Sequence, residues 1–153
     1  MAFLGRRIGI IGAGLCDEET YELSRETGRL VTERGGIVLC GGLGGVMEGA
    51  CRGAVEAGGL TIGILPGFKA SDANPYIKIP IVTGLSHARN VVLVRSCQAL
   101  ISISGSHGTL SEIALALKMW KPVVGLRTWE NLKDVHYVNS PEEAVEKAFE
   151  LLD

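Results

Sequence analysis

Residues 99–117 read Ala-Leu-Ile-Ser-Ile-Ser-Gly-Ser-His-Gly-Thr-Leu-Ser-Glu-Ile-Ala-Leu-Ala-Leu, and two different hydrophobic patterns meet inside them. The apolar positions 99, 100, 101 and 103 predict a buried strand, whereas positions 110, 113, 114 and 117 have the spacing of a helix. Glycines 105 and 108 separate the two patterns. We therefore predict a strand, a glycine turn and a helix that follows Thr109, for which Thr109 is a candidate N-cap.

A glycine turn between a strand and a helix is a favourable place for an anion. The first N–H groups of a helix have no acceptors within the helix, and the helix dipole adds positive potential there, so phosphate is the ligand we expect. Glu112, roughly one helical turn further on, would place a carboxylate beside it. The candidate phosphate-binding residues of this turn are Gly105, Ser106, His107, Gly108 and Thr109.

Other predicted strands also end at turns that contain glycine. Arg7–Ile11, Ile37–Cys40 and Leu60–Leu65 are short apolar runs, and each is followed by one or more glycines. Ligands of open parallel sheets bind outside the carboxyl ends of the strands, at the point where the strand order reverses. The further candidate ligand-binding residues in these turns are Gly12, Gly14, Gly41, Gly42, Gly45 and Met47.

The remaining elements alternate between helix and strand. Asp17 and Ser86 are candidate N-caps, and residues 68–80 form the one long irregular stretch. Strands that are continuous apolar runs indicate a parallel sheet covered on both faces, so we predict one doubly wound α/β domain over residues 1–153. Helices are predicted over Glu18–Arg34, Val46–Ala57, His87–Ser96 and after Ser140, and further strands over Ile81–Val82, Val123–Leu126 and Val135–Val138.

Composition narrows the possible functions. The 153 residues carry a formal net charge of −2, which gives no general attraction for nucleic acid or an anionic membrane. No apolar run approaches the length of a membrane span, and none near the start is long enough for a secretory signal. The four cysteines form no C-x-x-C pair and lie in apolar surroundings, which predicts reduced core cysteines in a cytoplasmic protein.

The glycine turns do not match the best-known nucleotide-binding motifs. Gly12-Ala-Gly14 lacks the third glycine of G-x-G-x-x-G, and Cys40-Gly41-Gly42 stands where an acidic residue for the ribose is expected. We therefore do not expect NAD or FAD. The absence of G-x-x-x-x-G-K-[ST] excludes a P-loop NTPase at the level of the motif. The histidines and cysteines are not at metal-ligand spacing, so no metal site is expected.

Arg89 is the cation of greatest interest. It falls in the first turn of its predicted helix, where a positive charge opposes the helix dipole. One interpretation is a solvated surface arginine. The other is a guanidinium that faces the crevice and either binds phosphate or pairs with Glu112. Glu112 also has a structural interpretation, because the dipole favours glutamate early in a helix whatever the function.

Two of these turns resemble the paired motifs of the LOG (lonely-guy) family, which was long labelled as possible lysine decarboxylases. The family motifs are G-G-G-x-x-G-x-M-G and P-G-G-x-G-T-x-x-E. Here residues 40–48 read Cys-Gly-Gly-Leu-Gly-Gly-Val-Met-Glu, and residues 104–112 read Ser-Gly-Ser-His-Gly-Thr-Leu-Ser-Glu. The resemblance covers nearly the whole chain. It implies a Rossmann-like fold, usually dimeric, whose second glycine turn takes the 5′-phosphate of a nucleoside monophosphate.

In active LOG members an arginine and the motif glutamate hydrolyse the N-glycosidic bond and release the base and ribose 5-phosphate. The resemblance assigns these catalytic roles to Arg89 and Glu112. Three departures put hydrolysis in doubt: Asn90 replaces a lysine, and Ser104 and Ser106 replace the proline and second glycine of the motif. These changes are similar to the branch that contains small bacterial proteins and molybdenum-cofactor carriers, which hold a phosphate-bearing ligand without hydrolysing it.

Two functional hypotheses follow. The first is a binding protein or carrier for a phosphorylated small molecule, either a nucleotide or a pterin-type molybdenum cofactor, with no cofactor required for activity. The alternative is a nucleoside 5′-monophosphate phosphoribohydrolase. A pyridoxal-phosphate decarboxylase is rejected, because no lysine lies at a glycine turn. The apolar run at residues 91–94 predicts a helix buried on several sides, so we also expect a homodimer or larger homo-oligomer.

Overall fold

The apolar run at the centre of the sequence forms strand β5 (Ala99–Ile103), which lies beside β1 (Arg7–Gly12) in the middle of a seven-stranded sheet. The computed structural model describes residues 5–153. The strand order is β4-β3-β2-β1-β5-β6-β7, and every neighbouring pair is parallel. The other strands are β2 (Ile37–Cys40), β3 (Thr61–Leu65), β4 (Ile79–Val82), β6 (Val123–Leu126) and β7 (Val135–Val138).

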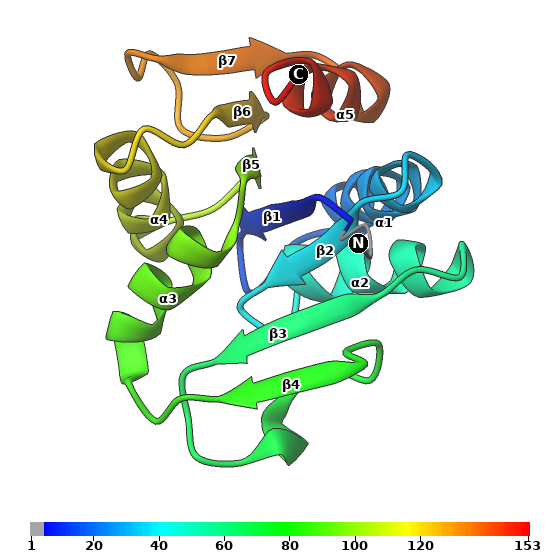
Figure 1. The fold of residues 1–153 in the computed structure, drawn as a ribbon, viewed down its shortest axis with the longest axis vertical. Helices are drawn as coiled ribbons and strands as arrows, with labels where there is room; N and C mark the ends of the chain where they lie inside the picture. Colours follow the sequence, from blue (N-terminus) through cyan, green and yellow to red (C-terminus); the bar gives the residue numbers. More distant parts are fainter. Residues whose placement is uncertain (1–4) are drawn as a thin grey trace.

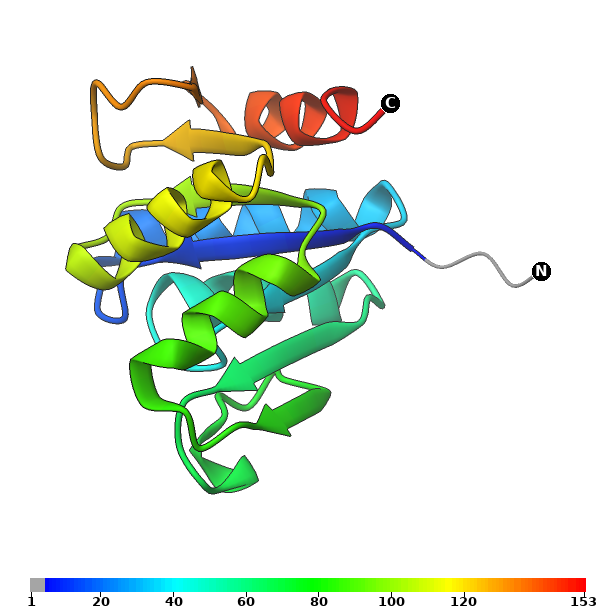
Figure 2. The same cartoon turned by 60° about the vertical axis from the view of Figure 1, so that its left-hand side comes forward.

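Within the part of the chain that the structure describes, five α-helices cover the two faces of this sheet; their arrangement can be followed in Figures 1 and 2. Helices α1 (Glu18–Glu33), α2 (Val46–Glu56) and α5 (Pro141–Glu150) pack on one face, and α3 (Arg89–Ser96) and α4 (His107–Lys118) pack on the other. The doubly wound parallel α/β fold expected from the sequence is therefore confirmed, and its topology is Rossmann-like. Among the described residues, no helix has the length and hydropathy needed to cross a bilayer.

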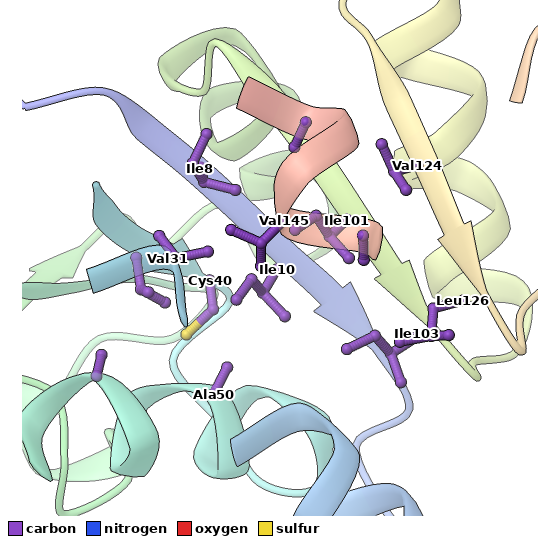
Figure 3. Close-up of a cluster of buried hydrophobic side chains, with 14 of the residues drawn as sticks. Ile8, Ile10, Val31, Cys40, Ala50, Ile101, Ile103, Val124, Leu126 and Val145 are labelled. Carbon is purple, nitrogen blue, oxygen red and sulfur yellow. The ribbon is translucent and has the colours of Figure 1, made fainter. Parts of the chain in front are cut away.

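The core lies between the central strands and the helices. Ile10 of β1 and Ile101 of β5 are register partners, and both are fully buried. Their side chains belong to a cluster that also contains Ala50 of α2 and Val145 of α5 (Figure 3). Burial of a large aliphatic side chain stabilises a fold by roughly 1.5–3 kcal/mol. The two central strands are thus fixed firmly, and so are the turns that follow them.

The strand order reverses between β1 and β5. The chain runs outward from β1 through β2 and β3 to β4, and then returns through α3 to β5 on the other side of β1. The turns after β1 and β5 therefore diverge to opposite faces and leave a crevice at the carboxyl edge. In Figure 2 the arrowheads of β1, β3 and β6 point to this common edge, where α4 begins.

Some predicted helix starts are confirmed and others are wrong. Asp17 caps α1, because its Oδ1 accepts a hydrogen bond of 2.8 Å from the N–H of Thr20. Ser86 caps nothing: it has a φ of 54° and opens the short 3-10 helix η2 (Ser86–Ala88), so α3 begins only at Arg89. Thr109 is likewise not an N-cap, because α4 begins at His107.

The stretch over residues 68–80 is less irregular than expected. It contains the 3-10 helix η1 (Ala70–Asp72), and its last two residues already belong to β4. The buried side chain of Asn74 donates to the carbonyl of Leu43 at 2.8 Å, and the N–H of Asn74 donates to the carbonyl of Gly42 at 2.9 Å. Asn74 therefore ties this stretch to the glycine turn after β2.

Candidate functional site

A pocket of about 150 Å³ opens at the carboxyl edge of the sheet, where the turns after β1, β2 and β5 come together. Helices α3 and α4 contribute their first turns to its wall. The switch in strand order thus coincides with a real cavity. The residues that line it are Ile11, Gly12, Ala13, Gly14, Gly41, Met47, His87, Arg89, Asn90, Ser106, Gly108, Thr109 and Glu112.

Most of the candidate residues named from the sequence line this pocket, but four do not. Gly42 packs against Leu65, and Gly45 precedes α2 close to the carbonyl of Ala13. Gly105 packs against the side chain of Thr109, with a φ of 111° that favours glycine. The exposed ring of His107 lies 6.0 Å from that of Trp129. These four residues do not form the pocket wall.

The amino end of α4, where Gly108 and Thr109 line the pocket and His107 lies just outside its wall, has free N–H groups. Within residues 5–153, the backbone N–H groups of His107, Gly108 and Thr109 have no hydrogen-bond acceptor, and the preceding Ser106 makes no side-chain cap. A Cβ placed on Gly108 would meet no atom within 4 Å. The space beside Gly108 is therefore open, and the amides at this end of α4 are unpaired where the helix dipole favours an anion.

Arg89 lines the pocket from the first position of α3. Its Nη1 donates to the backbone carbonyls of Gly41 at 2.5 Å and Ile64 at 2.6 Å, so the guanidinium joins the carboxyl ends of β2 and β3 to α3. Burial lowers the pKa of Arg89, while the charge of Glu112 raises it. Of the two roles considered for Arg89 in the crevice, an ion pair with Glu112 is not formed among the described residues, and phosphate binding stays a prediction. The two carbonyls hold the guanidinium instead.

Asn90 connects Arg89 to the amino end of α4. Its Oδ1 accepts from Nε of Arg89 at 2.8 Å, and its Nδ2 donates to Oγ of Ser111 at 3.1 Å. Ser111 in turn donates to the carbonyl of Gly108 at 2.7 Å. From the sequence, Asn90 was interpreted only as a lost positive charge. The available signal in the sequence was a polar residue placed between Arg89 and the apolar run at residues 91–94.

Glu112 is a buried carboxyl group without a partner. Its side chain lies on the pocket wall with 8% of its surface exposed, and it makes no hydrogen bond or ion pair with any described residue. Burial raises the pKa of Glu112 to about 7, and the positive charge of Arg89 opposes this shift. A carboxyl group with such a pKa can donate or accept a proton near neutrality.

Two glycines allow the backbone to approach other groups closely at this site. A Cβ on Gly12 would lie 2.0 Å from the carbonyl oxygen of Ile103, so only glycine permits this contact between the ends of β1 and β5. A Cβ on Gly41 would lie 2.5 Å from Nη1 of Arg89. Glycine is therefore needed at position 12, whereas a side chain at position 41 would displace the guanidinium of Arg89.

No metal-binding cluster accompanies the pocket within the described part of the chain, where no three His, Cys, Asp or Glu side chains gather. His87 lines the pocket, although the sequence analysis gave it no role. Its position two residues before Arg89 was the available signal. Cys40, Cys51 and Cys97 are free and buried in the core as expected, whereas Cys16 is only half-buried.

The fold and pocket together define a Rossmann-like α/β protein with a small polar cavity at the topological switch point. A family model described as the SLOG cluster4 family matches residues 5–150, and the chain belongs to this family. An uncharacterised protein of Archaeoglobus fulgidus is 48% identical over 139 residues, which cover 91% of each chain.

Two solved structures are also similar to this chain. The molybdenum cofactor binding protein from the phototrophic bacterium Rippkaea orientalis is 35% identical, with a TM-score of 0.93 over 99% of this chain and 100% of that one. The molybdenum cofactor carrier protein from Chlamydomonas reinhardtii is 36% identical, with a TM-score of 0.89 over 97% of this chain and 99% of that one. The relation to the molybdenum-cofactor carrier branch, first indicated by the sequence motifs, is thereby confirmed.

Proposed function

We propose that this protein binds and carries a phosphate-bearing small molecule of the pterin-type molybdenum cofactor class, and that the amino end of α4 takes the phosphate. Two solved structures that match nearly the whole chain at 35% and 36% identity are named for binding or carrying the molybdenum cofactor, which supports this ligand class. The pocket at the point where the strand order reverses supports placing the ligand beside α4.

The observation that carries the proposal is the set of unpaired amides at α4. The N–H groups of His107, Gly108 and Thr109 point from the positive end of a twelve-residue helix, and Gly108 leaves the space before them open. Such a group of amides binds phosphate without a cationic side chain. Arg89 adds a positive charge to the same wall, with one guanidinium nitrogen held by backbone carbonyls.

Titration of the purified protein tests this proposal. Isothermal calorimetry would use inorganic phosphate, AMP and molybdenum cofactor released anaerobically from a molybdoenzyme. We expect all three to bind at one site per chain, with the cofactor binding most tightly and phosphate competing with it. Failure of both phosphate and the cofactor to bind would contradict the proposal.

A second function rests on Glu112. A buried, unpartnered carboxyl group with a pKa near 7 on the pocket wall suits hydrolysis of an N-glycosidic bond, in which it would stabilise positive charge on the ribose or orient water. The products from AMP and water would be adenine and ribose 5-phosphate. Chromatography of AMP incubated with the protein separates the two functions. Adenine release that disappears in Glu112→Gln would favour the hydrolase, whereas binding without release favours the carrier.

A further inference from the structure

A second and larger pocket adjoins the same turn. It has a volume of about 600 Å³ and lies past the carboxyl ends of β6 and β7, at the same edge of the sheet as the pocket at α4. Figure 2 shows the connection between β6 and β7 at the end of the molecule where α4 begins. Its lining residues are Arg127, Thr128, Glu130, Asn131, Tyr137, Val138 and Asn139.

Hydrogen bonds join the wall of this second pocket directly to the turn before α4. The N–H of Ser104 donates to the carbonyl of Arg127 at 2.9 Å, and Oγ1 of Thr128 donates to the carbonyl of Ser104 at 2.7 Å. The indole N–H of Trp129 donates to the carbonyl of Ser106 at 2.9 Å. Arg127 and Thr128 therefore line the second pocket and also support the turn that leads to the free amides.

The small volume of the pocket at α4 indicates why an organic phosphate ester would need a second pocket. Pockets for small organic ligands usually measure about 300–1,000 Å³, and the cavity at α4 is smaller than this range. At about 150 Å³ it suits a phosphate group, and the neighbouring cavity of about 600 Å³ has room for a fused heterocycle. An elongated phosphate ester could thus use both pockets at once.

The chemistry of the second pocket favours an uncharged heterocycle over a second phosphate. Arg127 and Glu130 bring opposite charges, and Arg127 is already ion-paired with Glu19 at 2.8 Å. The side chains of Asn131 and Asn139 each offer a donor and an acceptor, which matches the amino-oxo edge of a pterin or guanine ring.

The loop that forms this pocket is held in place. The ring of Tyr137 is 43% exposed, so one face is available for an aromatic ligand. Its hydroxyl group donates to the carbonyl of Trp129 and accepts from the N–H of Leu132 at 3.1 Å. The ring therefore stands in a fixed orientation before any ligand arrives, which lowers the entropic cost of binding.

We propose that the pocket lined by Asn131, Tyr137 and Asn139 binds the heterocyclic end of the phosphate ester whose phosphate lies at α4. This inference rests on the proposed function. It goes further because it assigns a separate pocket to the heterocyclic ring, which a simple sugar phosphate lacks.

The test compares GMP, which has an amino-oxo edge, with ribose 5-phosphate, which has no ring base. The Trp120→Phe background leaves Trp129 as the single tryptophan of the chain. Its fluorescence is the readout, because Trp129 lies between Thr128 and Glu130 of the second pocket and donates to Ser106 of the first. The test variant combines Asn131→Gly with Asn139→Ala, because glycine tolerates the φ of 60° at position 131. Lys133→Ala, an exposed change in the same loop outside the pocket, is the control.

We expect the double variant to bind GMP about tenfold more weakly, while its affinity for ribose 5-phosphate and that of the control for both compounds stay unchanged. An unchanged preference for GMP over ribose 5-phosphate in the double variant would contradict binding of the heterocycle in the second pocket. The proposed function would then still stand. Failure of the unmutated protein to bind either compound or inorganic phosphate would instead overturn the proposed function together with this inference.

Discussion

Glu112 places a carboxyl group in the pocket wall where little water reaches it. Its pKa of about 7 lies well above the ordinary value of 4.5. Below pH 4.5 the group is protonated in both the folded and the unfolded chain, so its burial has no electrostatic cost. Between pH 4.5 and 7 the unfolded chain loses this proton first, and stability falls by about 3 kcal/mol as the pH rises.

We therefore predict that Glu112→Gln stabilises the protein more at pH 8 than at pH 5, because glutamine cannot ionise. Urea unfolding at the two pH values measures the difference in the free energy of unfolding. Glu130→Gln is the matched control, since Glu130 is exposed and its replacement should change stability equally at both pH values. An equal effect of Glu112→Gln at pH 5 and pH 8 would show that the carboxyl group is not buried as described.

The site residues also show how much of the pocket could be predicted from the sequence. Arg89 and Glu112 were both assigned to the site, and both line the pocket. Their direct pairing, one of the two alternatives that the sequence left open, is not formed, because it depends on which acceptors lie nearest to the guanidinium. Those acceptors are the carbonyls of Gly41 and Ile64, which are 48 and 25 residues away in the sequence. No local pattern reveals such a contact.

Helix α4 is the element on which the proposed phosphate site depends. The Cα–Cβ bonds of a helix tilt toward its amino end, so a side chain added at Gly108 would project toward a bound anion. We predict that Gly108→Ala weakens binding of inorganic phosphate by about tenfold while stability is kept, because a Cβ there meets nothing within 4 Å and alanine favours helix. Calorimetric titration and thermal unfolding give the two readouts.

Gly105→Ala is the informative comparison for this element. Gly105 has a φ of 111°, and a Cβ there would lie 2.3 Å from Oγ1 of Thr109, so this variant should lose stability by about 1–3 kcal/mol. The two glycines thus separate a site effect from a folding effect. Phosphate binding by Gly108→Ala at full strength would be inconsistent with a ligand at these amides.

At the level of elements, the hydrophobic periodicity predicted every strand, but helix starts were less predictable. The segment at residues 86–89 begins as a 3-10 turn because Ser86 adopts a φ of 54°, and α4 starts two residues earlier than Thr109. Helix ends depend on how the preceding turn packs on the sheet. Propensity and capping residues carry only part of that information.

The whole molecule leaves an apolar surface uncovered. All four residues of β4 are exposed at the sheet edge, and no α-helix lies across this strand in Figures 1 and 2. Val91 and Val92 of α3 are also exposed, although the sequence pattern predicted burial. Exposed apolar patches of this kind mark protein–protein contacts. The exposed apolar residues of this region are Ile79, Ile81, Val82, Leu85, Val91 and Val92.

We predict that two copies of the chain associate through this surface. Light scattering at micromolar concentration should give the mass of a dimer or larger oligomer, and Ile81→Glu should reduce it to that of one chain without unfolding it. Leu15→Glu is the control, because Leu15 is 93% exposed outside this surface. A monomeric mass for the unmutated protein would remove the prediction of a homo-oligomer.

The amino-acid sequence alone was enough to predict the parallel α/β architecture. Apolar strands alternate along the chain with amphipathic helices, and few other folds bury the apolar faces of both. The sequence also placed the glycine turns at one edge, because the carboxyl ends of parallel strands must lie together. The folded structure was needed to show which turns form a pocket, that Arg89 is held by backbone carbonyls and that Glu112 has no partner among the described residues. These features arise from contacts between residues far apart in the chain, and the packed core fixes their geometry.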